Sequence, residues 1–319
     1  MPAKFTNTLD VPELLYDAIL NDEYVSRGHI STTSLIDSPR VRLLKRANEY
    51  TIDASQMLFA LLGKGVHSVL ESRASKAGER YLIEHQMAIQ VEGWEVTGTG
   101  DLYDILHRRL DDYKSTSVWK AMRGVEHSQE WVKQTNIYAY MLRRLGYEVK
   151  SIRIIAIMRD WKESKSRYSA DYPKSSVITL DIPIWDDEAV LRYITERVKL
   201  HQEQEKLFFL GKDDGTVDEK AIEYCTAKER WALPETWRLV PKGKTRSVKN
   251  FEIVTEADTQ AAGEFIKANK DKNLQIQVSE GLDMRCETYC PVNKFCSYWL
   301  SKNPSGTGAI QTEIEGELF

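Results

Sequence analysis

The stretch GTGDLYDILHRRLDDYK, residues 98–114, decides how this chain folds. Asp101 lies in one extended run, residues 94–106, and Asp112 and Lys114 lie in the next, residues 110–115. Residues two apart on a strand point to the same face of a sheet, so Asp112 and Lys114 project together. Asp101 from the neighbouring strand can join them. The stretch therefore predicts two carboxylates and an ammonium group at one place.

Such a group must either pair its charges or hold a cation, because burying unpaired charge is costly. Two carboxylates that converge from adjacent strands form a hard oxygen site suited to Mg²⁺ or Mn²⁺. The ammonium group of Lys114 cannot ligate the cation while protonated, but it can orient a water molecule or stabilise charge on a phosphoryl group. This combination is typical of metal-assisted phosphodiester hydrolysis. An Asp-x-Lys triplet taken alone is more often an ordinary surface ion pair.

Two further aspartates compete for the same role. Asp111 alternates away from Lys114 on its strand, and Asp104, three residues after Asp101, alternates away from Asp101. We therefore expect Asp101 and Asp112 to face the site.

The surrounding pattern predicts an α/β fold with a mixed central β-sheet flanked by helices. Helices are expected at residues 11–22, 39–50, 55–72, 130–145 and 188–210. Strands are expected at residues 81–91, 94–106, 110–115, 147–158 and 177–184, with a turn at Glu92-Gly93. Along the chain we expect a helical N-terminal segment (1–54), a core (55–210), a cysteine-bearing C-terminal segment (211–300) that begins with a linker, and a flexible acidic tail (301–319).

Composition limits the class of protein. The 319 residues are 42% hydrophobic and 29% charged, which excludes collagen, low-complexity disorder and a small disulfide scaffold. Apolar runs fall far short of the ~20 residues that span a bilayer, and the first ten residues lack a signal-peptide core. The net charge of −4 says little, but residues 226–250 hold seven Lys and Arg against two acids. That excess favours a polyanionic partner, although solvated faces explain it equally well.

Further residues extend the motif into a series. His67 precedes the expected hairpin, Glu84 stands near its start, and Gln134 and Tyr138 lie four apart on the following helix. With G-x-x-D and then D-x-K on successive strands, this order resembles the RecB-like branch of the PD-(D/E)xK nuclease superfamily over roughly residues 55–158. The resemblance implies a restriction-endonuclease-like core, a divalent-metal-dependent deoxyribonuclease activity, and a cytoplasmic protein of a bacterial or phage-infected cell with no membrane partner.

The resemblance also assigns roles. It implies that Asp101, Asp112, His67 and the backbone carbonyl of Tyr113 bind Mg²⁺ or Mn²⁺, and that Lys114 is the catalytic lysine. Glu84 becomes a metal-proximal carboxylate, and Gln134 and Tyr138 become contacts to the substrate backbone. Taken singly, His67 is more often a core histidine. A solvent-facing strand residue is the alternative for Glu84, and helix packing explains Tyr138 equally well.

All four cysteines follow the expected core. Cys286, Cys290 and Cys296 form a C-x3-C-x5-C trio, and Cys225 stands alone. Four thiolates complete the ligand set of one Zn²⁺ ion or one 4Fe-4S cluster. Iron–sulfur RecB-like nucleases, including the AddB-type and CRISPR-associated ones, imply a 4Fe-4S cluster with a structural role, with Zn²⁺ as the alternative. Those relatives often have C-x2-C in the trio and carry the lone cysteine before the core.

Basic residues interleaved with tryptophans can follow a phosphate backbone and stack on unpaired bases. Aromatic packing around a metal-stapled core explains the later ones equally well. The expected DNA contacts are Lys120, Arg123, Arg230, Trp231, Lys242, Lys244 and Arg246. The resemblance implies an exonuclease that acts on single-stranded or frayed DNA ends in recombination or repair. The alternatives are a nucleic-acid-binding module without turnover and a metal-stapled interaction protein.

Overall fold

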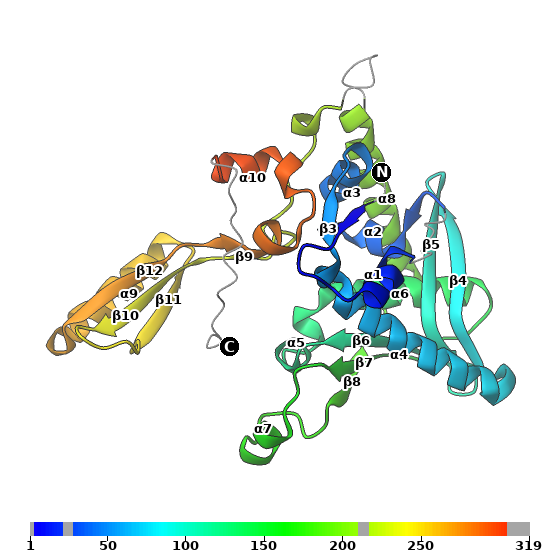
Figure 1. Cartoon of the computed structure of the whole chain (residues 1–319), viewed down its shortest axis with the longest axis horizontal. Coiled ribbons are helices and arrows are strands. Elements are labelled where there is room, and N and C mark those ends of the chain that lie inside the picture. Colours follow the sequence, from blue (N-terminus) through cyan, green and yellow to red (C-terminus); the bar gives the residue numbers. More distant parts are fainter. Residues whose placement is uncertain (1–2, 22–27, 210–216, 305–319) are drawn as a thin grey trace. The chain divides into compact units, whose positions relative to one another are not determined.

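The computed structural model describes residues 3–21, 28–209 and 217–304. Its contacts divide the chain between Ile222 and Glu223 into two units (Figure 1). The boundary falls twelve residues after the one expected at 210/211. Arg40 explains the difference, because its buried guanidinium donates a 3.0 Å hydrogen bond to the carbonyl of Ile222 and pairs with Glu219. The chain therefore stays with the first unit as far as Ile222.

A six-stranded mixed sheet forms the centre of the first unit, as the sequence predicts. Its strands run in the order β2-β5-β6-β7-β8, with β4 also paired to β5. The pairs β4/β5, β5/β6 and β7/β8 are antiparallel, and β2/β5 and β6/β7 are parallel. The strands are β2 (Ile30–Ser31), β4 (Tyr81–Val91), β5 (Trp94–Asp104), β6 (Arg109–Thr116), β7 (Ser151–Met158) and β8 (Val177–Ile182).

Helices cover this sheet. The main ones are α6 (Gln129–Arg144) and α8 (Asp187–Phe209), whose apolar faces contribute Ile137, Met141, Ile194 and others to one core with the strands. The α4 helix (Leu58–Ala74) contacts β4 and β6. Shorter elements of the unit are η2 (Ser75–Arg80), α5 (Val118–Met122), η3 (Val125–His127), α7 (Glu163–Tyr168) and η4 (Glu219–Ala221).

The N-terminal segment packs onto this core and does not stand apart from it. The α2 helix (Thr32–Ile36) contacts α6 and α8, and α3 (Pro39–Ala47) contacts α8. The α3 helix begins at Pro39, as its sequence predicts, because a proline at the first helical position loses no hydrogen bond. The remaining elements are β1 (Lys4–Thr6), which pairs with β3 (Thr51–Asp53), α1 (Glu13–Leu20) and η1 (Ala54–Met57).

Most predicted boundaries agree with the structure. The hairpin turns at Glu92 and Gly93, whose φ angles are 49° and 75°, as a two-residue hairpin turn requires. The β5 strand ends at Asp104 and not at 106, and β7 begins at Ser151 and not at 147. Most of the expected linker, and the end of the expected acidic tail, lie outside the described residues.

The second unit contains strands that the sequence did not predict. Its three-stranded antiparallel sheet has the order β11-β10-β12 and carries the helix α9 against β11. These elements are β10 (Glu235–Pro241), β11 (Lys249–Ile253), α9 (Glu256–Ala268), η5 (Lys270–Lys272) and β12 (Leu274–Ser279). The cysteines lie among β9 (Ala232–Leu233), β13 (Leu282–Asp283), the π-helical turn η6 (Arg285–Tyr289), η7 (Asn293–Phe295) and α10 (Ser297–Lys302).

Candidate metal centre

The candidate site lies where β5 has no strand partner on one of its edges. One edge of β5 pairs with β4 along most of its length. The other edge pairs with β2 at Val96 and Thr97 and with β6 only from Leu102 onwards. Among the described strands, residues 98–101 therefore have no neighbour on that second edge. Side chains from β5 and β6 meet in the gap.

Asp101 occupies this gap. Its Oδ2 accepts a 2.8 Å hydrogen bond from the backbone N–H of Tyr113, in place of a strand-to-strand bond. The imidazole of His67, on α4, also hydrogen-bonds to the backbone of Tyr113. The main chain of Tyr113, an expected ligand, thus lies at the site together with two of the other expected ligands.

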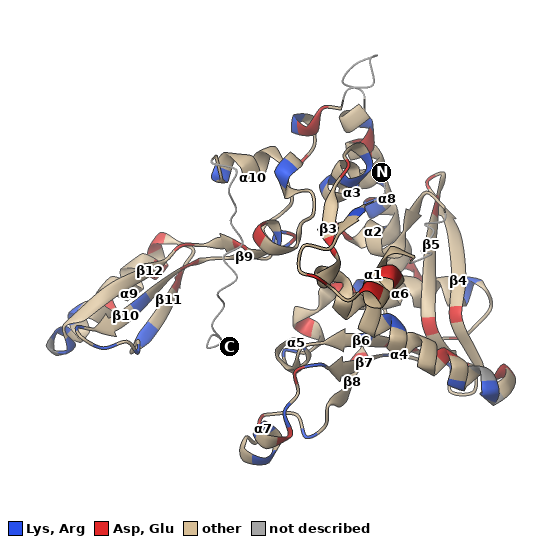
Figure 2. Cartoon of the chain, in the orientation of Figure 1, with Lys and Arg blue, Asp and Glu red and all other residues tan. Residues whose placement is uncertain are grey.

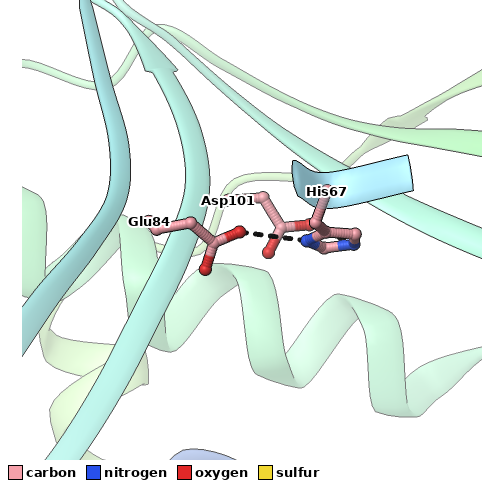
Figure 3. Close-up of side chains that lie close together, drawn as sticks. All are labelled: His67, Glu84 and Asp101. Carbon is pink, nitrogen blue, oxygen red and sulfur yellow. Dashed lines mark hydrogen bonds and ion pairs between the residues drawn. The ribbon is translucent and has the colours of Figure 1, made fainter. Parts of the chain in front are cut away.

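Three side chains from three elements converge here (Figure 3). His67 Nδ1 lies 3.0 Å from Glu84 Oε1, and His67 Nε2 lies 3.7 Å from Asp101 Oδ2. One ligand atom from each of the three lies within 4.8 Å of the others, and among the described residues this is the one group of three or more metal-ligating side chains so arranged. Helix α4 supplies His67, and the two strands of the β4–β5 hairpin supply Glu84 and Asp101.

Glu84 reaches the site through an unusual backbone conformation. It lies opposite Asp101 in the β4/β5 register, but the pairing passes from Ile83 to His85 without it. Its φ angle is +43°, in the left-handed region that residues other than glycine seldom adopt. Such a conformation is typical of functional sites, where the surrounding structure maintains the strain.

Asp112 and Lys114 form the second half of the site. Lys114 Nζ lies 2.7 Å from Asp112 Oδ2, and the side chains are 24% and 1% exposed. Apart from this ion pair, neither carboxylate oxygen of Asp112, both of them buried, has a hydrogen-bond partner among the described residues. A buried carboxylate ordinarily accepts several hydrogen bonds.

The site concentrates charge away from solvent. Burial, together with the nearby carboxylate of Asp112, raises the pKa of Asp101 to about 7, although Lys114 and His67 oppose the shift. Burial lowers the pKa of Lys114, but Asp112 and Asp101 outweigh it, and the net shift is upward. The hydrogen bond to Glu84 raises the pKa of His67. Burial is the main cause of the shift at Asp101, whereas neighbouring carboxylates raise the pKa values of Lys114 and His67.

These properties fit a hard divalent cation. The close group combines one imidazole and two carboxylates, those of His67, Glu84 and Asp101. Asp112 is not a member of that group, but its buried carboxylate contributes to the raised pKa of Asp101. A cation next to Asp101 and Asp112 relieves the repulsion that raises the pKa of Asp101. An open groove of about 440 Å³ leads to the site, lined by His67, Glu84 and residues of α4 including Lys64 and Ser68. Lys64 and Ser68 belong to no motif in the sequence.

Gln134 and Tyr138 lie on α6 and contact each other. Gln134 Nε2 donates a 2.9 Å hydrogen bond to the Tyr138 hydroxyl. The Tyr138 ring is 5% exposed and lies against Gly98, where a Cβ atom would come within 2.6 Å of it. Tyr138 therefore packs against β5 directly beside the gap, and Gln134, half-buried, is the more accessible of the two.

The two competing aspartates face elsewhere, as strand alternation predicts. Asp111 accepts hydrogen bonds from Arg153 and Arg109. Asp104 is fully buried and accepts hydrogen bonds from Arg80 and His107. Both carboxylates accept hydrogen bonds from two cationic side chains, whereas Asp112 has one cationic partner, Lys114.

Helix α5 and the residue directly after it carry two of the expected DNA contacts, Lys120 and Arg123. Lys120 pairs with Glu130 at 2.7 Å and lies over the Trp131 ring. Arg123 lies 4.4 Å from the ring centre of Trp119, which is 52% exposed. The structure thus presents Arg123 and Trp119 to solvent as a stacked pair, while Lys120 already has a partner.

The four cysteines lie within the second unit. Cys286 and Cys296 are buried, and Cys225 and Cys290 are half-buried. Burial, with smaller effects from the other three thiols and Asp283, raises the pKa of Cys286 to about 12. Among the described residues, the four sulfurs do not form a group with mutual distances below 4.8 Å. A tetrahedral zinc site places its sulfurs only about 3.8 Å apart, given Zn–S bonds of about 2.3 Å.

Arg230 and Trp231 contact the cysteine segment. Arg230 Nε donates a 2.9 Å hydrogen bond to Asp283, its guanidinium lies over Tyr298, and it also donates to the carbonyl of Cys225. Trp231, 49% exposed, lies against the Tyr289 ring. Arg230 is thus occupied within the unit, which corresponds to the packing alternative. Lys242, Lys244 and Arg246 are exposed in the turn between β10 and β11.

Comparisons with known proteins identify no family. No family model and no curated protein matches this chain. A solved structure described as "Crystal structure of SSO0001" matches with a TM-score of 0.41 and 20% identity, over 59% of this chain and 85% of that one. Among the described residues, no helix is both long and apolar enough to span a membrane.

Proposed function

We propose that this protein is a divalent-metal-dependent deoxyribonuclease of the RecB-like PD-(D/E)xK type, with a restriction-endonuclease-like core. One observation carries the proposal: His67, Glu84 and Asp101 converge in a gap of the sheet, and the buried ion pair of Asp112 and Lys114 acts on the same group. Asp104 and Asp111 accept hydrogen bonds from two cationic side chains each, whereas Asp112 has the single ion pair with Lys114.

The residues present divide the work of phosphodiester hydrolysis. His67, Asp101, Asp112 and the main chain of Tyr113 hold Mg²⁺ or Mn²⁺, with Glu84 next to them. A cation bound there activates water and neutralises charge on the phosphate. Lys114 stays protonated because its pKa is raised, and it places positive charge beside the phosphoryl oxygens. Gln134 orients the substrate backbone.

The resemblance of the motifs extends the proposal to substrate and pathway. We take the substrate to be single-stranded DNA or frayed DNA ends, cut by an exonuclease in recombination or repair. The open groove beside His67 and Glu84 supports access for a strand. The cell compartment implied by the same resemblance is the cytoplasm of a bacterial or phage-infected cell.

The cysteines belong to the same proposal. Four thiols in one unit, two of them buried, provide the donors of a 4Fe-4S cluster. The arrangement of a lone cysteine with a C-terminal trio, which resembles that of the iron–sulfur nucleases, favours the cluster over Zn²⁺. Its role is structural, since it ties Cys225 to the C-terminal trio.

A nuclease assay with single-stranded and duplex DNA, with Mg²⁺, with Mn²⁺ and with EDTA, tests the activity. We expect cleavage with either cation and none with EDTA. Asp112→Ala abolishes it, and Lys114→Ala lowers kcat by roughly 100- to 1,000-fold. Asp171→Ala, which removes an exposed carboxylate elsewhere in the first unit, leaves cleavage unchanged.

The outcomes separate the alternatives. A wild-type protein that binds DNA but never cleaves it under these conditions is a nucleic-acid-binding module without turnover. A protein that neither cleaves nor binds DNA at low salt is an interaction protein. Loss of cleavage in Asp112→Ala with DNA binding retained supports the enzyme.

A further inference from the structure

The second unit gathers basic side chains at one end of its sheet. The β10 strand ends at Pro241, and β11 and β12 both begin at that same end, since Leu239 pairs with Lys249 and Pro241 with Leu274. The β10–β11 turn carries Lys242, Lys244 and Arg246 on this end. The end of α9 and the 3-10 turn η5 that follows it supply three further cations, namely Lys267, Lys270 and Lys272. These six residues are called the basic end here (Figure 2).

The two turns form one structure. The backbone N–H of Lys242 donates a 3.1 Å hydrogen bond to the carbonyl of Asn273, which joins the first turn to the second. The six residues lie in segments about thirty positions apart along the chain, so only the β10/β12 pairing brings them together. The opposite end of the same sheet and helix carries the acids Glu235, Glu252, Glu256 and Asp258.

The cations of the basic end lack carboxylate partners among the described residues. All six are exposed, and none forms an ion pair with a described acid. Some exposed cations of the first unit are paired, as in Lys4–Glu49 and Lys199–Glu92, whereas others, such as Lys162 and Lys165, form no ion pair with a described acid. Lys267 stabilises the C-terminus of α9 through the helix dipole, but the β10–β11 turn has no such role.

We propose that the basic end binds the phosphodiester backbone of DNA, as a second contact remote in sequence from the metal centre. This inference rests on the proposed function and names a partner site for it. Besides Lys and Arg, the two turns offer Thr245, Ser247 and Asn273, the residue types that bind phosphate oxygens. Val248 is the exposed large apolar side chain within them, and a protein interface needs a more apolar centre.

This contact does not depend on the base sequence of the DNA. Phosphate contacts fix position and supply affinity through released counterions, so their contribution falls steeply with salt. A contact of this kind holds a long substrate near the metal centre without taking part in cleavage. It therefore acts on KM for long DNA and leaves kcat unchanged.

The test compares two triple variants of the full chain with the same change in net charge. Lys244→Gln, Arg246→Gln and Lys270→Gln remove charge from the basic end. As the control, Lys4→Gln, Lys150→Gln and Lys199→Gln remove the same charge from ion pairs in the first unit.

DNA binding is measured in EDTA, without cleavage, as a function of salt. We expect the basic-end variant to bind roughly tenfold or more weakly, with a salt slope smaller by about 0.9 per lost contact on duplex DNA. The control variant binds like wild type.

Each other outcome overturns the proposal. Equal affinity and slope for wild type and the basic-end variant show that DNA does not contact this end. An equal loss in both variants shows a general charge effect. Vesicles of an anionic phospholipid that bind wild type but not the basic-end variant, with DNA binding unchanged, assign the surface to a membrane. The binding measurement needs no cleavage. Its result can therefore be interpreted even if the nuclease assay shows no activity.

Discussion

Asp101 is the residue that couples the candidate metal centre to pH. Burial and the neighbouring Asp112 raise its pKa to about 7, so the folded, metal-free protein binds its proton more tightly than the unfolded chain does. Between about pH 4 and pH 7 the unfolded chain has released this proton while the folded protein retains it. Protonated Asp101 therefore contributes to the stability of the metal-free protein at low pH, and this contribution is lost as pH rises through that window.

A cation competes with that proton, because the ligands must be deprotonated to bind it. We expect Mn²⁺ to raise the unfolding temperature little at pH 5.5 and increasingly toward pH 8. Thermal unfolding with Mn²⁺ and with EDTA across this range measures the difference. Asp101→Asn should remove both the stabilisation and its pH dependence. A stabilisation that is constant from pH 5.5 to pH 8 would contradict the assignment of Asp101 as a ligand.

For single residues, the sequence predicted which face of the sheet a side chain points to better than it predicted the conformation of the backbone. Strand alternation placed Asp112 with Lys114 and turned Asp111 away, because the period of a strand is fixed. Glu84 was predicted to lie near the metal on resemblance alone. Its left-handed backbone has no local signal, since glutamate, unlike glycine or asparagine, does not favour that region.

At the scale of elements, the position of α6 against β5 depends on Gly98. A Cβ atom there would lie 2.6 Å and 2.9 Å from two carbons of the Tyr138 ring and 3.0 Å from Thr32 Oγ1. Because Tyr138 is buried within α6, it has little room to move. The same strand offers a control at Gly100, where the nearest atom, the flexible end of Met87, would be 3.4 Å away.

We expect Gly98→Ala to destabilise the protein by about 1–3 kcal/mol, the usual effect of overpacking. Gly100→Ala should be neutral or stabilising by up to about 1 kcal/mol, because alanine restricts the unfolded chain more than glycine does. Chemical denaturation of both variants gives the comparison. Equal effects at the two positions would show that α6 does not press against β5 at residue 98.

Elements were predictable where their patterns are local. The β4–β5 hairpin has a two-residue turn between alternating strands, and α6 has a clear helical period, so both were predicted nearly to the residue. The strands β10, β11 and β12 are short and mix polar with apolar residues, and β12 is largely exposed. Strands of this kind are stabilised by pairing with neighbours distant in sequence, which no local pattern reveals.

At the scale of the whole molecule, each unit has an apolar core of its own. The first unit buries residues such as Leu110, Ile137 and Ile194, and the second buries Leu239, Ala262 and Val292. The sequence placed the division near residue 210, at a stretch rich in glycine and aspartate. The buried cation of Arg40 moved it to Ile222, and a tertiary contact between residues 182 positions apart cannot be inferred from composition.

Separate cores predict separate unfolding transitions. In calorimetry of the full chain we expect two unfolding transitions, and a different ligand or substitution shifts each of them. Mn²⁺ should raise the transition of the first unit alone, and Gly98→Ala should lower that same transition. Cys286→Ser should lower only the other, because Cys286 lies in the second unit and its thiol is one of the four proposed cluster ligands. A single transition that Mn²⁺ and Cys286→Ser both shift would mean that the two cores unfold together and that the units are not independently stable.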